Sequence, residues 1–251
     1  LSQAGLQAAL DRAEAQAQLI AGHALLNLSQ EPVCHERADF FSPDLDQAFP
    51  SLSECFELLS AESAAVPKDE RLVSWVVSLG LNHVEQIYLN SAGAELRRAQ
   101  RFVYPGMGVT AYDGNDSQSR SLGRENFGQQ GGADVISRCG LIGAAPQVAD
   151  QALQLLLAPN APVGKRDLLL MPDQMILQIH ESIGHPLELD RILGDERNYA
   201  GTSFVKASDF GSLQYGSKLL NVTFDPTIPE ELASYRFDDD GTPAYKEFLI
   251  R

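Results

Sequence analysis

Basic residues are scarce in this sequence, which has 19 Lys and Arg against 34 Asp and Glu and a formal net charge of −15. A surface of this sign repels phosphate backbones, which argues against direct binding of DNA or RNA. No stretch approaches the roughly 18 to 20 consecutive apolar residues of a membrane span, and the first residues lack a signal-peptide pattern. We therefore expect a cytoplasmic protein that does not contact membranes.

Cysteine is also scarce. The three cysteines, Cys34, Cys55 and Cys139, are scattered and form no CxxC pair, which argues against a disulfide framework and favours reduced thiols. Hydrophobic residues nevertheless make up 44% of the 251 residues. This is enough to build a packed core in one or two domains.

Apolar residues at three- and four-residue spacing predict two helices in residues 1–65. In the first, Leu6 and Leu10 lie on one face of a segment that extends to Leu28. The second spans Ser51 to Ala65, with a serine as its N-cap. A loop marked by two prolines connects them.

The hydrophobic period changes to two in residues 70–113, which predicts antiparallel strands of a meander. The segment Asn90–Gly93 has the residues of a turn that reverses one strand into the next. Helices packed on such a meander make an α+β fold.

Residues 114–132 are rich in Gly, Asn, Ser and Gln and predict an exposed loop. Neither a GxGxxG fingerprint nor a GxxxxGK[ST] loop is present, so the segment does not predict a nucleotide site. Residues 133–157 return to helical spacing, with the first half interrupted by Gly140 and Gly143. The second half is predicted to be a regular helix.

Two prolines and a glycine in Pro159–Gly164 predict a domain boundary. We expect an N-terminal domain over 1–158 and, over 159–251, the beginning of a mostly β domain. In the second part, Leu168–Met171 predicts a short buried strand. Pro172 marks the start of a helix that continues to Gly184.

That helix ends in His180-Glu181-Ser182-Ile183-Gly184-His185. Two neutral imidazoles and a nearby carboxylate that is not a ligand form the residue set of zinc hydrolysis sites. With five His and 34 acidic residues, the pattern would arise by chance roughly 0.01 times in a chain of this length. From the pattern alone, two histidines that cap or pack at a helix end remain the structural alternative.

The five-residue spacing of the histidines is one residue wider than in HExxH. A regular helix would place them roughly 140° apart around its axis. A single wide turn with i to i+5 hydrogen bonding would bring them nearly into line. Gly184 tolerates unusual dihedral angles and Pro186 cannot donate a hydrogen bond. The helix is therefore predicted to bend or end at His185.

Three motifs follow one another in the second part of the chain: His180–Glu188, Tyr199–Ser203 and Phe237–Pro243. Together they resemble the TldD/PmbA family of metalloproteases, and in particular its TldD-type subunit, which contains HExxxH. The meander and glycine-rich loop ahead of the motif are also similar to that family. Residues 159–251 then correspond to the start of the metalloprotease C-terminal domain.

The resemblance implies a zinc-dependent peptidase that hydrolyses short or unfolded peptides, paired with a PmbA-like (TldE-like) subunit or with itself. His180 and His185 would be zinc ligands, and Glu181 would activate the zinc-bound water as general base. Glu188 and Asp190 are either partners that orient an imidazole or surface charges. The turns at Gly201 and Gly241 are expected near the site in a structural role.

The sequence departs from the family in one respect that concerns the metal. The family's third zinc ligand is a cysteine in a distal C-terminal region, which nothing in this chain matches. We therefore expect a fragment that lacks both the start and the C-terminal part, and that binds metal weakly and is inactive by itself. The alternatives are a non-catalytic assembly subunit that pairs with a PmbA-like partner, or a modulator of DNA gyrase.

Overall fold

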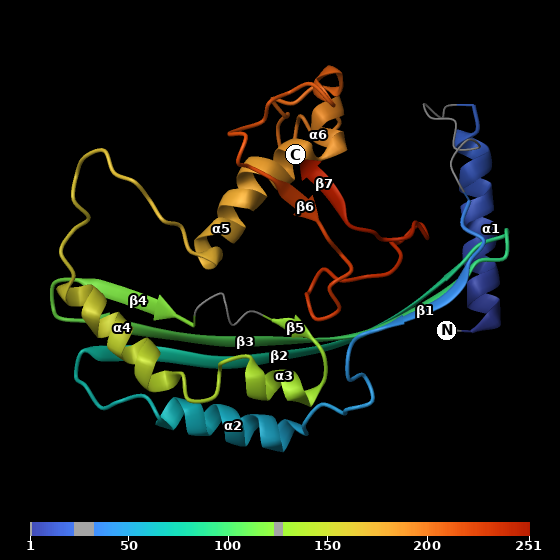
Figure 1. Cartoon of the computed structure of the whole chain (residues 1–251). Coiled ribbons are helices and arrows are strands. Elements are labelled where there is room, and N and C mark those ends of the chain that lie inside the picture. The colour runs from blue at the N-terminus through green and yellow to red at the C-terminus, as the bar shows by residue number, and fades with distance from the viewer. Residues whose placement is uncertain (1, 23–32, 123–127) are drawn as a thin grey trace.

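The computed structural model describes residues 2–22, 33–122 and 128–251 (Figure 1). Helix α1 spans Gln3–Ile20 and begins where Ser2 Oγ accepts a hydrogen bond from the Gly5 amide. Helix α2 spans Leu52–Ala64 and begins with a capping box between Ser51 and Glu54. Both predicted helices are confirmed. The predicted continuation of the first to Leu28 falls partly outside the described residues.

Two long strands form the middle of the sheet. Strands β2 (Leu72–Leu89) and β3 (Glu95–Tyr112) pair antiparallel along their whole length. The predicted turn is confirmed: the Asn90 side chain accepts hydrogen bonds from the Ala92 and Ala94 amides. The antiparallel pairing of the predicted meander is confirmed for this hairpin. Each strand continues through a glycine, Gly80 in β2 and Gly106 in β3, and a Cβ atom at Gly106 would collide with Ser78 Oγ.

Three short strands pair with the other edge of β3. Strand β1 (Arg37–Phe41) runs parallel to it, whereas β4 (Ser117–Ser121) and β5 (Gln129–Gln130) run antiparallel. The sheet is therefore mixed, and the prediction of a loop over 114–132 is wrong for β4 and β5. Both segments are polar and have no period-two apolar pattern, so backbone pairing with β3 defines them as strands.

Helices cover one face of the sheet. Helices α2, α3 (Ala133–Arg138) and α4 (Ala145–Leu157) lie on the same side of β2 and β3 (Figure 1). The break between α3 and α4 falls at the predicted glycines, since Gly140 and Gly143 both have positive φ. The hydrophobic core lies between these helices and β3, and its most buried members include Val103, Val109, Val135, Leu141, Ala145 and Ala149.

Residues 159–251 lie over the opposite face of the sheet (Figure 1). Their strands are β6 (Val222–Phe224) and β7 (Glu247–Ile250), which pair antiparallel, and the rest is helical or irregular. The expected mostly β character is not seen in this segment. The predicted buried strand at Leu168–Met171 is also wrong. These residues form an exposed coil, with Leu169 91% exposed, because no neighbouring strand pairs with them among the described residues.

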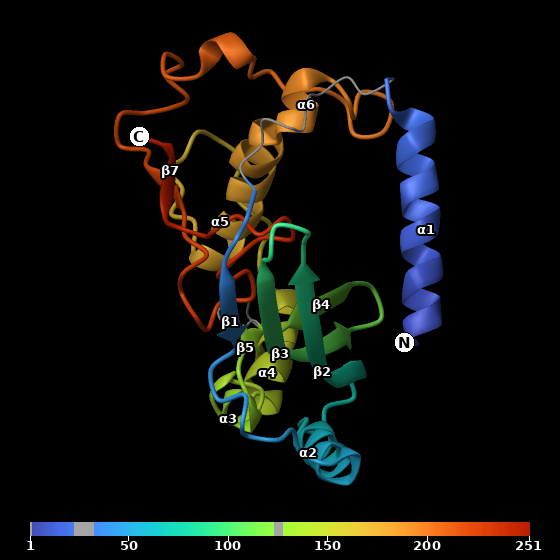
Figure 2. The ribbon, with the colours of Figure 1, turned by 90° about the vertical axis from the view of Figure 1, so that its right-hand side faces the viewer.

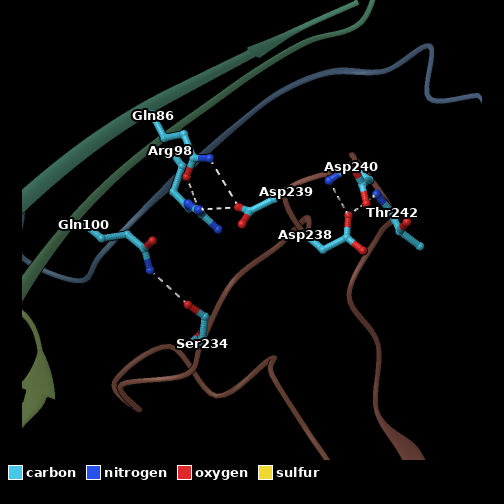
Figure 3. A network of polar contacts seen from close by, with 8 residues as sticks. All are labelled: Gln86, Arg98, Gln100, Ser234, Asp238, Asp239, Asp240 and Thr242. Atoms are coloured by element: carbon cyan, nitrogen blue, oxygen red, sulfur yellow. Dashed lines mark hydrogen bonds and ion pairs between the residues drawn. The ribbon is translucent and has the colours of Figure 1, made fainter. Parts of the chain in front are cut away.

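Polar contacts attach residues 230–244 to the sheet (Figure 3). Arg98 donates to Asp239 Oδ1 over 2.9 Å, and Gln86 donates to the same oxygen over 3.2 Å. Gly241 has φ +86°, and a Cβ there would lie 2.8 Å from Cys34 Cβ. The expected turn at Gly241 is thus present, and it packs against the sheet.

Across the described ranges, no helix has both the length and the hydropathy that a bilayer-spanning segment requires.

Candidate metal centre

The motif lies at the end of α5 (Pro172–Ile179), which begins at the predicted proline. A single π-helical turn follows over His180–Gly184, and the His185 amide donates to the His180 carbonyl, five residues earlier. The sequence-predicted i to i+5 turn is confirmed. Figure 2 shows α5 leading toward α6 (Leu189–Leu193) through this irregular segment.

The wide turn places the two imidazoles on the same side of the helix. Their ring centroids are 4.2 Å apart with an interplanar angle of 68°. One ligand atom from each of His180, Glu181 and His185 can be chosen so that all three lie within 4.8 Å of one another. A regular α-helix would have separated the histidines around the axis, so the π turn is what makes the cluster.

The π turn gives way to a tighter turn where proline enters. Residues His185–Leu187 form a 3-10 turn with Pro186 near its start, where its missing N–H removes no needed helical hydrogen bond. Gly184 has φ −55° and ψ −66°, which any residue adopts. The expected use of its unusual dihedral freedom is therefore wrong, and the wide turn forms with ordinary backbone angles.

One imidazole nitrogen of His185 is occupied by a carboxylate. His185 Nδ1 lies 2.7 Å from Glu188 Oε1, and Arg191 Nε lies 2.5 Å from Glu188 Oε2. The hydrogen bond from His185 and the charge of Arg191 lower the pKa of Glu188. A carboxylate on Nδ1 fixes the ring orientation and leaves Nε2 free to bind a metal. Asp190 accepts from the Arg191 amide.

Removing the Glu188 carboxylate is expected to weaken zinc binding by roughly 10- to 100-fold, because the His185 ring loses the group that orients it. Isothermal titration of Glu188→Ala with zinc measures this. Glu196→Ala is the matched control, since Glu196 faces Arg191 at 3.8 Å and makes no contact with an imidazole. Equal affinity in the two variants would mean that Glu188 is a surface charge.

Two side chains distant in sequence hold the backbone of the motif. Tyr215 donates its hydroxyl to the Ser182 carbonyl over 2.5 Å, and Ser203 donates to the Pro186 carbonyl over 2.6 Å. Burial raises the pKa of Tyr215. The turn at Gly201, with φ +82°, precedes Ser203. Tyr215 is a contact that sequence reasoning missed, because no local pattern connects it with the motif.

A cavity of 710 Å³ adjoins the motif on the side of Tyr215 and Leu187. Both polar and apolar side chains line it, among them Val205, Phe210, Lys218, Phe248 and Arg251. Its volume falls in the range of roughly 300 to 1,000 Å³ that small-ligand sites occupy.

The cluster fits a zinc ion in the kind and spacing of its nitrogen atoms. Two imidazole nitrogens suit zinc, and tetrahedral zinc would bring ligand atoms to about 3.4 Å from each other. The His180 and Glu181 side chains are 56% and 59% exposed, so both can rotate toward the solvent. The fit is therefore good for two ligands.

In the described part of the chain, no histidine, cysteine or carboxylate joins the cluster besides His180, Glu181 and His185. Cys139 is buried and donates to the Ile136 carbonyl in the core. Cys34 lies against Gly241, and Cys55 faces the Pro50 carbonyl.

A histidine pair with an adjacent free carboxylate on a helix is the donor set of metal-dependent hydrolases. Comparison with known protein families shows to which family of these hydrolases the chain belongs. Residues 46–158 match the PmbA/TldA metallopeptidase central domain, and residues 163–251 match the PmbA/TldA metallopeptidase C-terminal domain. The chain belongs to the PmbA/TldA (TldD/PmbA) metallopeptidase family.

Curated relatives agree with this assignment. A metalloprotease of Methanothermobacter thermautotrophicus is 28% identical over 71% of this chain and 37% of its own length. A metalloprotease of Methanocaldococcus jannaschii is 26% identical over 72% of this chain and 38% of its own length. One from Synechocystis is 30% identical over 57% of this chain. The matched region thus spans less than two fifths of these relatives. No solved structure is significantly similar to the chain.

Proposed function

We propose that this chain provides the histidine pair and the general base of a zinc-dependent peptidase that acts on short or unfolded peptides. The observation that supports the proposal is the π turn at His180–Gly184, which groups two imidazoles and one carboxylate. A bound zinc ion supplies Lewis acidity toward a peptide carbonyl and lowers the pKa of a coordinated water.

Two kinds of role, metal ligand and general base, would fall to residues of this chain. His180 would hold the ion through its imidazole, and His185 through Nε2, because Glu188 occupies Nδ1. Glu181 Oε1 lies 3.8 Å from His180 Nε2 and would not be a ligand. As general base it would take a proton from the attacking water and deliver it to the leaving amine nitrogen.

The openness of the site supports the substrate class. More than half of the His180 and Glu181 side chains is exposed, and the adjoining cavity has room for side chains of an extended peptide. A folded protein presents few such extended segments. The backbone of a short or unfolded peptide can extend across the histidine pair.

The test measures hydrolysis of fluorogenic peptides and of an unfolded protein at saturating zinc. A high concentration of zinc fills even a weak two-ligand site by mass action. The measured rate then reports on peptide hydrolysis and not on the affinity for zinc. The chain by itself should be inactive without added zinc, whereas saturating zinc should give turnover that falls by about 10²- to 10⁴-fold in Glu181→Gln, the usual contribution of a general base. Activity that survives Glu181→Gln would remove this residue from the mechanism.

A second candidate function is that of a non-catalytic assembly subunit. The absence of a third histidine or cysteine ligand from the described cluster favours it. The same assay distinguishes the two, since a chain that binds zinc at saturation but hydrolyses no peptide would support assembly and overturn the catalytic proposal.

A further inference from the structure

One backbone carbonyl of the histidine motif lacks its regular donor within the helix. In an α-helix the Ser182 carbonyl would accept from the amide four residues later, but that position holds Pro186, which has no N–H. The next amide, that of Leu187, belongs to the 3-10 turn His185–Leu187. In such a turn each amide is directed at the carbonyl three residues earlier, so the helix leaves the Ser182 carbonyl to a donor from elsewhere.

Tyr215 supplies this donor. Its hydroxyl donates to the Ser182 carbonyl across 33 residues of sequence. Ser182 is the middle residue of the π turn His180–Gly184, so the hydrogen bond lies between the two histidines. Burial raises the pKa of Tyr215 above the usual value for tyrosine. The hydroxyl therefore keeps its proton, and stays a donor, at neutral pH.

Neighbouring contacts hold the tyrosine in position. The Tyr215 ring lies against Phe204, with ring centroids 5.5 Å apart and an interplanar angle of 50°. Ser203, the residue before Phe204, donates to the Pro186 carbonyl over 2.6 Å. The segment on which Tyr215 packs is thus itself fixed to the end of the motif. Two hydroxyl groups, from Tyr215 and Ser203, bind the backbone on either side of the point where proline enters.

The turn needs such support because it interrupts a regular helix. π turns are rare inside α-helices, and this one is defined by the hydrogen bond from the His185 amide to the His180 carbonyl. A return to α geometry would separate the two imidazoles around the helix axis, although their ring centroids now lie 4.2 Å apart. A hydrogen bond that fixes the middle of the turn therefore controls the distance between the imidazoles.

We propose that Tyr215 is a positioning residue of the metal centre: its hydroxyl gives the Ser182 carbonyl the hydrogen bond that Pro186 cannot give, and so maintains the wide turn that brings the two imidazoles together. In this role Tyr215 acts through the backbone and not on the metal ion. The inference rests on the proposed function in taking the histidine pair as metal ligands, whereas the shape of the turn can be measured without metal.

Tyr215→Phe tests the proposal, because it removes the hydroxyl and keeps the ring. In the metal-free full chain, NMR should show exchange of the His185 amide that is faster by roughly 3- to 10-fold, the factor that one hydrogen bond contributes. The nuclear Overhauser effect between the two imidazole rings should weaken. Zinc affinity, measured by isothermal titration, should fall roughly 10-fold, as when a residue that orients a metal ligand is changed.

Tyr235→Phe is the matched control. Tyr235 is also partly buried, and its ring lies near Phe224, outside the motif. The same loss of a hydroxyl at this position should change neither the exchange of the His185 amide nor the affinity for zinc.

A second background distinguishes the proposed role from simple packing. Pro186→Ala gives position 186 an amide that can donate to the Ser182 carbonyl. In the Pro186→Ala background, Tyr215→Phe should therefore no longer speed the exchange of the His185 amide, because the carbonyl keeps a partner. Such a dependence of one substitution on the other is the sign of a shared interaction.

Three results would overturn the proposal. They are an unchanged His185 amide and ring contact in Tyr215→Phe, an equal increase in exchange in both backgrounds, and faster exchange throughout the chain, including the amides of β3. A failure of the proposed function looks different. An unchanged chain that shows the ring contact but binds no zinc would remove the metal centre, while exchange that responds to Tyr215→Phe as expected would still support the role of Tyr215 in the turn.

Discussion

Zinc binding is expected to be lost when either histidine of the π turn is replaced. His180→Ala and His185→Ala each remove one of the two imidazoles whose ring centroids are 4.2 Å apart. Changing a residue that only orients a ligand typically weakens binding by roughly 10- to 100-fold, so removal of a ligand itself should cost more than about 100-fold. Titration with zinc against a chromophoric chelator gives the affinity directly.

The control for these variants is His35→Ala. Its Nδ1 lies 3.2 Å from the Ala92 carbonyl at the tip of the hairpin, and it has no part in the cluster. We expect this variant to bind one zinc ion with unchanged affinity. If His180→Ala also retains full affinity, the two histidines pack or cap the helix end, and the structural alternative for the motif is correct.

The irregular turn at His180 could be predicted from sequence because several local signals agree. The five-residue spacing needs i to i+5 geometry to align the imidazoles, and Pro186 prevents the regular helix from continuing. Both features are encoded within a few residues. The contact of Tyr215 with Ser182 could not be predicted, since it joins segments 33 residues apart and depends on how the chain folds back.

In the sheet, too, the features encoded locally could be predicted and those that depend on distant segments could not. The hairpin of β2 and β3 could be predicted because period-two apolar residues and the Asn90 turn are both local. Strands β1, β4 and β5 could not be predicted, because they are strands only through their hydrogen bonds with β3, which is distant from β1 in sequence. β4 has the sequence Ser-Gln-Ser-Arg-Ser, which has no apolar face at all. The prediction for Leu168–Met171 is wrong for the opposite reason. Its apolar run predicts a buried strand, but no described strand pairs with it.

A polar network under residues 230–244 is centred on the side chain of Gln130. Gln130 is completely buried. Its side-chain oxygen accepts from Ser42 Oγ over 2.7 Å and from Gln100 Nε2 over 3.0 Å. Its Nε2 donates to the Glu231 and Ser234 carbonyls over 2.9 and 2.8 Å. One side chain thus connects β5, β3, the end of β1 and the C-terminal segment.

Gln130→Leu should lower the free energy of unfolding by about 2–4 kcal/mol, because it removes four hydrogen bonds of a buried side chain and each contributes about 0.5–1.5 kcal/mol. The Ser42 hydroxyl would lose its acceptor. The Glu231 and Ser234 carbonyls would each lose one donor but keep another, the Ser234 amide and Gln100 Nε2, both at 3.0 Å. Urea denaturation measures the change.

The neighbouring Gln129→Leu separates this effect from the general cost of altering β5. Gln129 is only partly buried, and its side-chain oxygen accepts from Arg138 on the exposed side. Its loss should cost less than about 1 kcal/mol, as at other solvated polar contacts. Hydrogen exchange should locate the difference: Gln130→Leu ought to expose the amides of residues 226–236 while those of β3 stay protected. Equal destabilisation by both variants, with uniform exchange, would show that Gln130 does not hold the C-terminal segment on the sheet.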